Sequence, residues 1–354
     1  MIEERKMSEV DDPEAMLSVQ NLHVEFSVGG NTIHAVNGLS LDLMKGETLA
    51  VVGESGSGKS VSMLSVLNLI PQPPGQITNG KILYQGRDLS SMPIAELRKI
   101  RGKEISMIFQ DPMTSLNPTM TIGRQITEML ELHLDMTTTQ SKARAIELLD
   151  IVGIPKPSER FSQYPIEFSG GMRQRVMIAI ALSCNPKILI ADEPTTALDV
   201  TIQKQILEVV NDLRAKMDMS VIWITHDLGV VAGLADRVIV MYGGRAVELA
   251  EAEDLFYNPQ HPYSVGLLNS VPSIADPVVD RLLAIDGLPP DLSKKQEGCA
   301  FHPRCPLATD QCRTMTPVLE SRSSGGLARC FASPEDVAAL AKQGADTRTD
   351  VKEG

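Results

Sequence analysis

The 354-residue chain has no apolar run that approaches the roughly 18 residues needed to cross a bilayer. Its first fifteen residues, MIEERKMSEVDDPEA, are acidic and lack the apolar stretch of a signal peptide. We therefore expect a protein of the cytosolic side, for which any contact with a membrane comes through partners.

An excess of basic residues is also missing. The chain has 33 Lys and Arg against 45 Asp and Glu, which gives a net charge of −12. Binding to nucleic acid in general needs a basic surface that neutralises phosphates, so this balance argues against it. The same balance disfavours docking on anionic lipid by charge alone. A hydrophobic content of 43% is ordinary for a soluble globular protein.

Cysteine is scarce except near the C-terminus, where four of the five lie between residues 299 and 330. In a reducing cytosol such a cluster indicates metal binding before disulfides. The spacings of five, six and seventeen residues lack the tight pairs of most zinc sites. Four thiolates on irregular loops, with Pro306 after one of them, suit a [4Fe–4S] cluster, and zinc or no metal are the alternatives. The candidate ligands are Cys299, Cys305, Cys312 and Cys330.

One further histidine and one further cysteine must be considered as possible metal ligands. His302 is either a fifth candidate ligand or a surface residue, and the surface position is the simpler interpretation. Cys184 ends an apolar helical stretch, which is typical of a buried core thiol.

Strands that alternate with helical patterns predict an α/β fold with a parallel sheet that binds ligands at the carboxyl ends of its strands. The alternation in LSVQNLHVEF and HAVNGLSLDL predicts antiparallel strands, closed by the turn at Lys45 and Gly46. We also expect strands at residues 47–52, 187–192 and 220–225, helices at 61–70 and 170–184, a helical insertion at about 111–170, and a hairpin at 236–248 that turns at Gly243 and Gly244.

The segment GESGSGKS at residues 53–60 matches the phosphate-binding pattern GxxxxGK[ST], between a predicted strand and a predicted helix. That context disfavours a chance glycine-rich turn. Lys59 should reach the β- and γ-phosphates of ATP or GTP, and Ser60 should ligate Mg²⁺. Backbone N–H groups of the loop and the helix N-terminus would surround the phosphates. The other residues expected to contact nucleotide here are Gly53, Glu54, Ser55, Gly56, Ser57, Gly58 and Val61.

The segment ILIADE supplies an acidic pair at the end of a buried strand. Asp192 should hold Mg²⁺, and Glu193 should polarise the attacking water. The alternative is a helix N-cap, which acidic residues favour. The phosphate loop with Lys59 upstream favours the catalytic interpretation.

The segment FSGGMRQR, which lies between the phosphate loop and ILIADE, resembles the signature of an ATP-binding-cassette (ABC) ATPase. In that family the serine and glycines cap the γ-phosphate of ATP held by the opposite subunit, so the resemblance assigns this role to Ser169, Gly170 and Gly171. The family usually has glutamine where this chain has Met172, which weakens a polar role for that side chain. The implied fold is an α/β ABC-ATPase cassette, with a RecA-like P-loop core, an antiparallel β subdomain and an inserted helical subdomain.

Four more residues match the family pattern. Gln110 after ISMIFQ corresponds to the glutamine that meets Mg²⁺ and senses the transporter subunit, and Asp199 to the loop that crosses to the other subunit. His226 after VIWIT corresponds to the histidine that contacts the γ-phosphate, although a lone histidine is often structural. Phe26 corresponds to the aromatic residue that stacks on adenine, with a core strand residue as the alternative.

The resemblance implies an active ATPase that works as a dimer. Each ATP would lie between the phosphate loop of one chain and the Ser169 segment of the other, so that ATP favours the closed dimer and hydrolysis reopens it. Residues 110–119 (QDPMTSLNPT) are expected to form the groove for a permease helix, or else a plain surface loop.

The segments FYNPQHPYSVGLLNSVP, IDGLPPDL and GCAFHPRCP closely resemble the C-terminal region of the oligopeptide/dipeptide/nickel branch of ABC importers. The form FSGGMRQRVMIA resembles the first of the two ATPase subunits of peptide systems. The resemblance implies import at the cytoplasmic face of the inner membrane, through two transmembrane permease subunits fed by an extracytoplasmic substrate-binding protein. It also implies a related ATPase as heterodimer partner and a [4Fe–4S] cluster on the four cysteines.

The sequence leaves other transported substrates and other classes of ATPase open. Nickel chelates, glycosides and opines are handled by similar ATPases. A soluble ABC ATPase of DNA repair or translation is disfavoured by the single cassette and the acidic balance, and a non-hydrolysing regulatory subunit by Glu193 and His226. The expected domains are a disordered tail at 1–15, the ATPase domain at 16–256, a small Cys-rich C-terminal extension at 257–332 and a disordered tail at 333–354.

Overall fold

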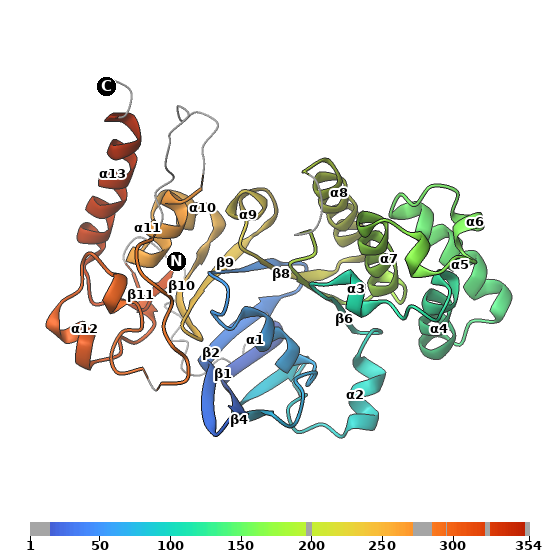
Figure 1. The fold of residues 1–354 in the computed structure, drawn as a ribbon, viewed down its shortest axis with the longest axis horizontal. Coiled ribbons are helices and arrows are strands. Elements are labelled where there is room, and N and C mark those ends of the chain that lie inside the picture. Colours follow the sequence, from blue (N-terminus) through green and yellow to red (C-terminus); the bar gives the residue numbers. More distant parts are fainter. Residues whose placement is uncertain (1–14, 196–199, 272–284, 295, 323–325, 351–354) are drawn as a thin grey trace. The chain divides into compact units, whose positions relative to one another are not determined.

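The computed structural model of the chain describes residues 15–195, 200–271, 285–294, 296–322 and 326–350 (Figure 1). They form two compact units. The first unit takes the residues before 43, residues 49–90 and those from 225 onward, and the second takes residues 43–48 and 91–224. The predicted tail at 1–15 falls almost entirely outside the described residues, as does Asp199.

The first unit carries two groups of strands, together with helices from the beginning and the end of the chain. Its elements are β1 (Ala15–Val28), β2 (Asn31–Met44), β3 (Thr48–Val52), α1 (Lys59–Val66), β4 (Gly75–Tyr84), β5 (Arg87–Asp88), α9 (Leu228–Leu234), β9 (Arg237–Tyr242), β10 (Arg245–Glu251), α10 (Ala252–Tyr257), α11 (Pro262–Asn269), η2 (His302–Arg304), α12 (Asp310–Thr314), β11 (Glu320–Ser321), β12 (Leu327–Ala328) and α13 (Pro334–Asp350).

The predicted antiparallel strands are confirmed, and they form a four-stranded sheet in the order β2-β1-β4-β5. β1 pairs with β4 so that Leu17 lies opposite Tyr84 and Phe26 opposite Gly75. Leu22 and Val24, two residues apart in β1, are fully buried, whereas His23 and Glu25 are only partly buried, as the period of two in a strand requires. This sheet therefore carries Phe26 near its end.

The second group of strands in this unit contains the predicted hairpin. β9 pairs in parallel with β3 and antiparallel with β10, and the hairpin turns at Gly243 and Gly244, both with positive φ. These strands end beside the phosphate loop, since the loop follows β3 directly.

The C-terminal segment belongs to the first unit, together with the phosphate loop. β12 pairs with β10, and β11 pairs with β12. Three aromatic rings from distant parts of the chain pack together, with the Tyr242 centroid 4.6 Å from that of Tyr263 and 5.2 Å from that of Phe301. The apolar core of the unit therefore includes residues on both sides of the expected boundary at 257.

The second unit combines a parallel sheet with most of the helices. Its elements are α2 (Ile94–Ile100), β6 (Ile105–Ile108), α3 (Pro112–Ser115), α4 (Ile122–Leu134), α5 (Thr138–Ile151), α6 (Pro157–Arg160), η1 (Pro165–Glu167), α7 (Gly170–Leu182), β7 (Ile188–Asp192), α8 (Val200–Met217) and β8 (Ser220–Thr225). β7 pairs in parallel with β6 and with β8, and the residues of all three strands are buried.

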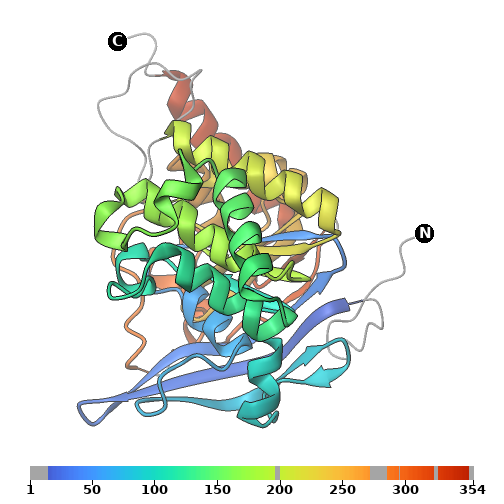
Figure 2. The same ribbon diagram turned by 90° about the vertical axis from the view of Figure 1, so that its right-hand side faces the viewer.

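Short polar caps determine where the helices of this unit begin. The Thr121 hydroxyl accepts from the Arg124 N–H at the start of α4, and Thr137 and Gln140 form a capping box on α5. Helices α4, α5 and α7 then pack against one another (Figure 2). Helices α3 to α6 and η1 fall within the segment 111–170, where the sequence predicts a helical insertion.

Two expectations differ from the structure. The helix predicted at 61–70 runs over Lys59–Val66, and Asn68 with φ 49° ends the helical path. The tail expected to be disordered at 333–354 contains α13, which Ser333 caps by accepting from the Asp336 N–H at 3.1 Å. Val337 of α13 is fully buried, so packing holds this helix as well.

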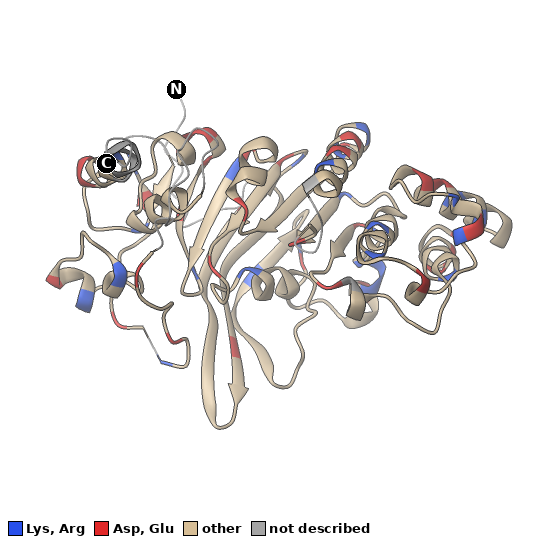
Figure 3. Cartoon of the chain, turned by 45° about the horizontal axis from the view of Figure 1, so that its top comes forward, with Lys and Arg blue, Asp and Glu red and all other residues tan. Residues whose placement is uncertain are grey.

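Hydropathy and charge along the helices can be described for the residues that the structure places. No helix among the described residues is both long and apolar enough to span a bilayer. Figure 3 shows Lys and Arg interspersed with Asp and Glu along the helices.

Candidate functional site

The phosphate loop joins β3 to α1 and is built on two glycines that no other residue can replace without distortion. Gly53 has φ +148° and Gly58 has φ +98°. A Cβ at Gly53 would lie 2.2 Å from the carbonyl oxygen of Met241, and one at Gly58 would lie 2.5 Å from that of Ala35. The glycines therefore permit both the turn and its close approach to β9 and β2.

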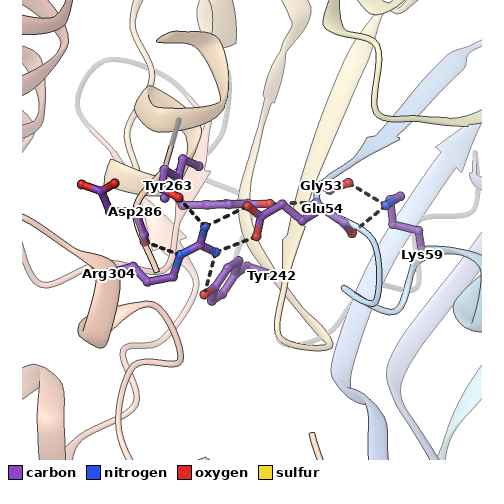
Figure 4. Close-up of polar contacts among 8 residues, drawn as sticks. Gly53, Glu54, Lys59, Tyr242, Tyr263, Asp286 and Arg304 are labelled. Carbon is purple, nitrogen blue, oxygen red and sulfur yellow. Dashed lines mark hydrogen bonds and ion pairs between the residues drawn. The ribbon is translucent and has the colours of Figure 1, made fainter. Parts of the chain in front are cut away.

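Lys59 points into this loop. Its side chain is buried, and Nζ donates to the carbonyl oxygens of Gly53 at 2.6 Å and Glu54 at 2.9 Å (Figure 4). The buried hydroxyl of Ser57 has no hydrogen-bond partner among the described residues. A concentrated positive charge and an unpaired buried donor inside a glycine-rich loop are the features of an anion-binding site.

Phe26 and His226 belong to the same unit as this loop. The Phe26 ring is partly buried and contacts Gly75, where an added Cβ would lie 2.8 Å from Cε1. His226 is exposed in the turn between β8 and α9. The Thr225 hydroxyl accepts from the Asp227 N–H at 2.9 Å, and Asp227 caps α9, so both neighbours hold the turn that carries His226.

The acidic pair lies at the end of β7 in the second unit. Asp192 is buried, whereas Glu193 is partly exposed and takes a left-handed backbone conformation with φ 45°. A left-handed conformation is uncommon for a residue other than glycine, and it is enriched at functional positions. Gln110 donates through Nε2 to Glu193 Oε2 at 3.2 Å, so the structure brings together two of the predicted catalytic residues.

The serine-glycine-glycine segment starts α7 as the sequence predicts. Ser169 is the N-cap and accepts from the Met172 N–H at 3.3 Å. Ser169 and Gly170 are exposed, and no atom lies within 4 Å of a Cβ built on Gly170. Met172 contributes its backbone N–H to this cap. The exposed N-terminus of a 13-residue helix is a second place where an anion can be bound.

The loop at residues 110–119 is largely exposed and contains α3. Met113 in it is 63% exposed, and the preceding Phe109 is 40% exposed. The structure thus leaves apolar side chains on the surface of the segment for which we expect permease contact.

Three contacts of the site could not be found in the sequence. Gln174 of α7 is buried and donates to the carbonyl oxygen of Pro194 at 2.5 Å, which ties the start of α7 to the segment after β7. Arg304 and Tyr263 both bind Glu54 of the phosphate loop. No sequence pattern marks the last two, because Arg304 lies 250 positions from Glu54.

The four cysteines of the C-terminal segment act on one another electrostatically. Burial is the largest of the effects that raise the pKa of the Cys305 thiol to about 12, and the other three thiols contribute to the same shift. Burial likewise raises the pKa values of Cys299 and Cys330. Four thiols match the donor set of an iron–sulfur cluster in their chemistry. Within the described residues, however, no group of three or more His, Cys, Asp or Glu side chains is arranged to hold a metal ion.

The phosphate loop, the acidic pair and the capped start of α7 define an ATP-binding cassette. The family model for ABC transporters matches residues 36–196, and the model for the C-terminal region of oligopeptide/dipeptide transporters matches residues 247–312. A solved dimeric structure of the ATP-binding cassette MJ0796 bound to ADP and Pi aligns with a TM-score of 0.62 at 28% identity, covering 67% of this chain and 99% of that one.

Curated relatives indicate which kind of ABC transporter this chain resembles. The chain is 53% identical over 318 residues to the dipeptide transport ATP-binding protein DppD of Bacillus subtilis, a match that covers 90% of this chain and 95% of the relative. It is 49% identical over 324 residues to the oligopeptide transport ATP-binding protein OppD of Escherichia coli, with 92% and 95% covered. The chain therefore belongs to the ABC transporter family, in its branch of oligopeptide and dipeptide transport ATP-binding proteins.

Proposed function

We propose that this chain is the ATP-hydrolysing subunit that powers import of di- and oligopeptides across the cytoplasmic membrane. The observation that carries the proposal is the phosphate loop, where buried Lys59 and the unpaired Ser57 hydroxyl lie inside a turn of positive-φ glycines. The names of the relatives, which are peptide transport ATP-binding proteins, support the substrate class.

Each predicted site residue has a role in this proposal. Lys59 and the loop N–H groups neutralise the β- and γ-phosphates, and the Ser57 hydroxyl donates to a phosphate oxygen. Glu193 polarises the attacking water, and His226 contacts the γ-phosphate. Phe26 stacks on adenine through its partly exposed ring.

A magnesium ion would be held by Ser60, Gln110 and Asp192, whose hydroxyl, amide and carboxylate oxygens are the ligands that Mg²⁺ prefers. Such an ion would supply positive charge that neutralises the phosphates during hydrolysis. The hydrogen bond from Gln110 to Glu193 also orients the carboxylate that polarises water.

The proposed working form is a pair of cassettes. Ser169, Gly170 and Gly171 would cap the γ-phosphate of ATP on a second cassette, with Asp199 crossing to it. The exposed Ser169 cap of α7 supports this arrangement, and so does the dimeric state of the MJ0796 cassette with which this chain aligns. We propose a related ATPase as the partner, two permease subunits above the pair near residues 110–119, and an extracytoplasmic substrate-binding protein. The chain would then be peripheral, at the cytoplasmic face of the inner membrane.

We also propose that the Cys-rich C-terminal region holds a [4Fe–4S] cluster on Cys299, Cys305, Cys312 and Cys330. The support is the four thiols that this segment carries and its match to the C-terminal region of oligopeptide/dipeptide transporters. A bound cluster would cross-link the loops that carry these thiols. The second interpretation, a structural zinc ion, uses the same residues.

The test of the proposed function is Glu193→Gln in a single-turnover assay with MgATP. The expected result is retained ATP binding and hydrolysis at this chain's loop reduced by about a hundredfold to ten-thousandfold, since the group that polarises water is lost. Glu208→Gln is the matched control, because Glu208 is an exposed carboxylate on α8 that pairs with Lys204. Unchanged hydrolysis in Glu193→Gln would contradict the assignment, and a wild-type protein that does not bind MgATP would contradict the function itself.

A further inference from the structure

The second residue of the phosphate loop is held from outside the loop. Arg304 donates from Nη1 to Glu54 Oε2 at 2.6 Å and from Nη2 to Glu54 Oε1 at 2.9 Å, which is a two-point contact between guanidinium and carboxylate (Figure 4). Such paired contacts fix the orientation of both groups as well as their distance. The carboxylate of Glu54 is thereby directed toward η2, the helix that Arg304 ends.

Arg304 is itself immobilised by its surroundings. Its side chain is only 4% exposed, against 27% for Glu54. Nε donates to the Asp286 carbonyl oxygen at 2.9 Å and Nη2 to that of Ile285 at 3.1 Å, while Nη1 also donates to the Tyr242 hydroxyl at 3.3 Å. The hydrogen bond to Glu54 raises the pKa of Arg304 above its ordinary value, so the guanidinium stays charged.

The backbone of Glu54 is anchored as well. Its N–H donates to the Tyr263 hydroxyl at 2.8 Å, and Tyr263 of α11 is fully buried. Burial raises the pKa of Tyr263, so the hydroxyl stays protonated. Figure 4 shows Arg304 and Lys59 on opposite sides of Glu54. The side chain and the N–H of Glu54 are thus both engaged by residues outside the loop.

We propose that Arg304 is a positioning residue for the phosphate loop, which acts with Tyr263 by holding Glu54 so that the loop keeps the shape that receives the phosphates of MgATP. Glu54 in this proposal anchors the loop and does not contact the nucleotide, unlike the expectation from the sequence. The inference rests on the proposed function insofar as the ligand is ATP.

The physical reason is the entropy of a glycine-rich loop. Gly53, Gly56 and Gly58 have positive φ and many accessible conformations, so ordering them is costly. An anchor on Glu54 orders the loop before the nucleotide arrives, and binding then loses less conformational freedom. Breaking the anchor should weaken the binding of ATP in the ground state and in the transition state alike, and so raise KM while kcat changes little.

The experiment is a double-mutant cycle on the full chain, with Arg304→Met, Glu54→Gln and the double variant, and MgATP affinity measured by calorimetry. We expect each single variant to weaken MgATP binding by about tenfold, and the double variant to be no weaker than the weaker single. In the nucleotide-free protein, hydrogen exchange of the peptide covering residues 53–60 should be faster in Arg304→Met. If Arg304 had only a general structural role, the hydrogen exchange of residues 53–60 would not change selectively.

Two controls sharpen the result. Arg313→Met removes an exposed arginine from the same segment, which pairs with Asp310, and should leave MgATP affinity and loop exchange unchanged. Arg304→Lys keeps the charge but loses the two-point contact, and should recover only part of the affinity.

Single variants that bind MgATP as the wild type does, or losses that add to about a hundredfold in the double variant, would overturn the inference. If Arg304→Met fails to fold, the MgATP affinity of Glu54→Gln alone tests the inference. This variant is expected to fold, because the Glu54 side chain lies partly at the surface. These outcomes leave the proposed function standing, whereas absence of MgATP binding in the wild type would contradict the function.

Discussion

Individual residues of the phosphate loop carry constraints of very different strength. Gly53 and Gly56 both have positive φ, yet a Cβ at Gly53 would meet the Met241 carbonyl oxygen at 2.2 Å, while one at Gly56 would meet nothing within 4 Å. The backbone oxygen of a central strand cannot move away as a side chain can. The two glycines therefore separate the effect of a steric clash from that of backbone conformation.

We predict that Gly53→Ala lowers MgATP affinity by about a hundredfold or more, because the loop must leave its position beside β9. Gly56→Ala is the matched control. We expect it to lower the free energy of unfolding by only about 1–2 kcal/mol, which is the cost of a left-handed backbone conformation for alanine. Calorimetric titration with MgATP, together with thermal unfolding of both variants, measures the difference. Equal losses in the two variants would show that clash with Met241 plays no part.

Glu248 is a buried carboxyl whose titration should be visible in the stability of the protein. Its two oxygens accept from the backbone N–H groups of Gln260 at 2.7 Å and His261 at 2.9 Å. Burial nevertheless raises its pKa from the ordinary 4.5 to about 7. Between these two values the folded protein binds more protons than the unfolded one, so stability falls as pH rises through this window.

We predict that the wild type loses about 3 kcal/mol of unfolding free energy from this group between pH 4.5 and 7, and that Glu248→Gln does not. Glutamine resembles the protonated acid, because it keeps one acceptor and carries no charge. The difference between the denaturation free energies of the two proteins, measured across this range, isolates Glu248 from His261, whose pKa burial lowers to about 3 in both. A difference that is constant with pH would show that Glu248 titrates normally.

At the scale of single elements, α7 shows how a helix start can serve both folding and function. Ser169 satisfies the Met172 N–H of its own helix and remains exposed. Thr137 of α5 is also an N-cap in this unit, and nothing assigns it a role in nucleotide chemistry. The two caps form a matched pair for experiments.

We predict that Ser169→Ala and Thr137→Ala each cost about 1 kcal/mol of stability, as loss of an N-cap does. Only Ser169→Ala should weaken ATP-dependent pairing with a second cassette, because only this cap is proposed to face a nucleotide. Sedimentation with MgATP in a Glu193→Gln background measures the pairing. If Thr137→Ala impaired pairing as much, the loss would reflect helix stability and not the phosphate cap.

At the scale of the whole molecule, the C-terminal segment shares one compact unit with the phosphate loop. It joins the first unit through β12 on β10 and through Phe301 in the aromatic cluster, and Arg304 brings it to the phosphate loop. Loss of order in this segment should therefore weaken the binding of nucleotide at the phosphate loop.

The proposed cluster can be tested on the whole chain. We predict that protein purified without oxygen is brown and contains about four irons, and that Cys330→Ser loses the iron. Cys184→Ser is the control and should keep it, since Cys184 lies in the second unit and donates to the Met129 carbonyl oxygen. A colourless protein with one zinc ion would favour the second interpretation, and a metal-free protein would exclude both.

The sequence by itself determined the local features: the phosphate loop, the acidic pair at the end of β7, the start of α7 and the hairpin at Gly243. These depend on neighbours along the chain, through apolar periodicity, capping side chains and backbone freedom at glycine. Only the tertiary structure decided that Glu193 takes a left-handed backbone, that α13 is ordered by the burial of Val337, and that Arg304 holds Glu54. Such contacts join residues far apart in the chain, and packing of the folded core selects them, so no short pattern records them.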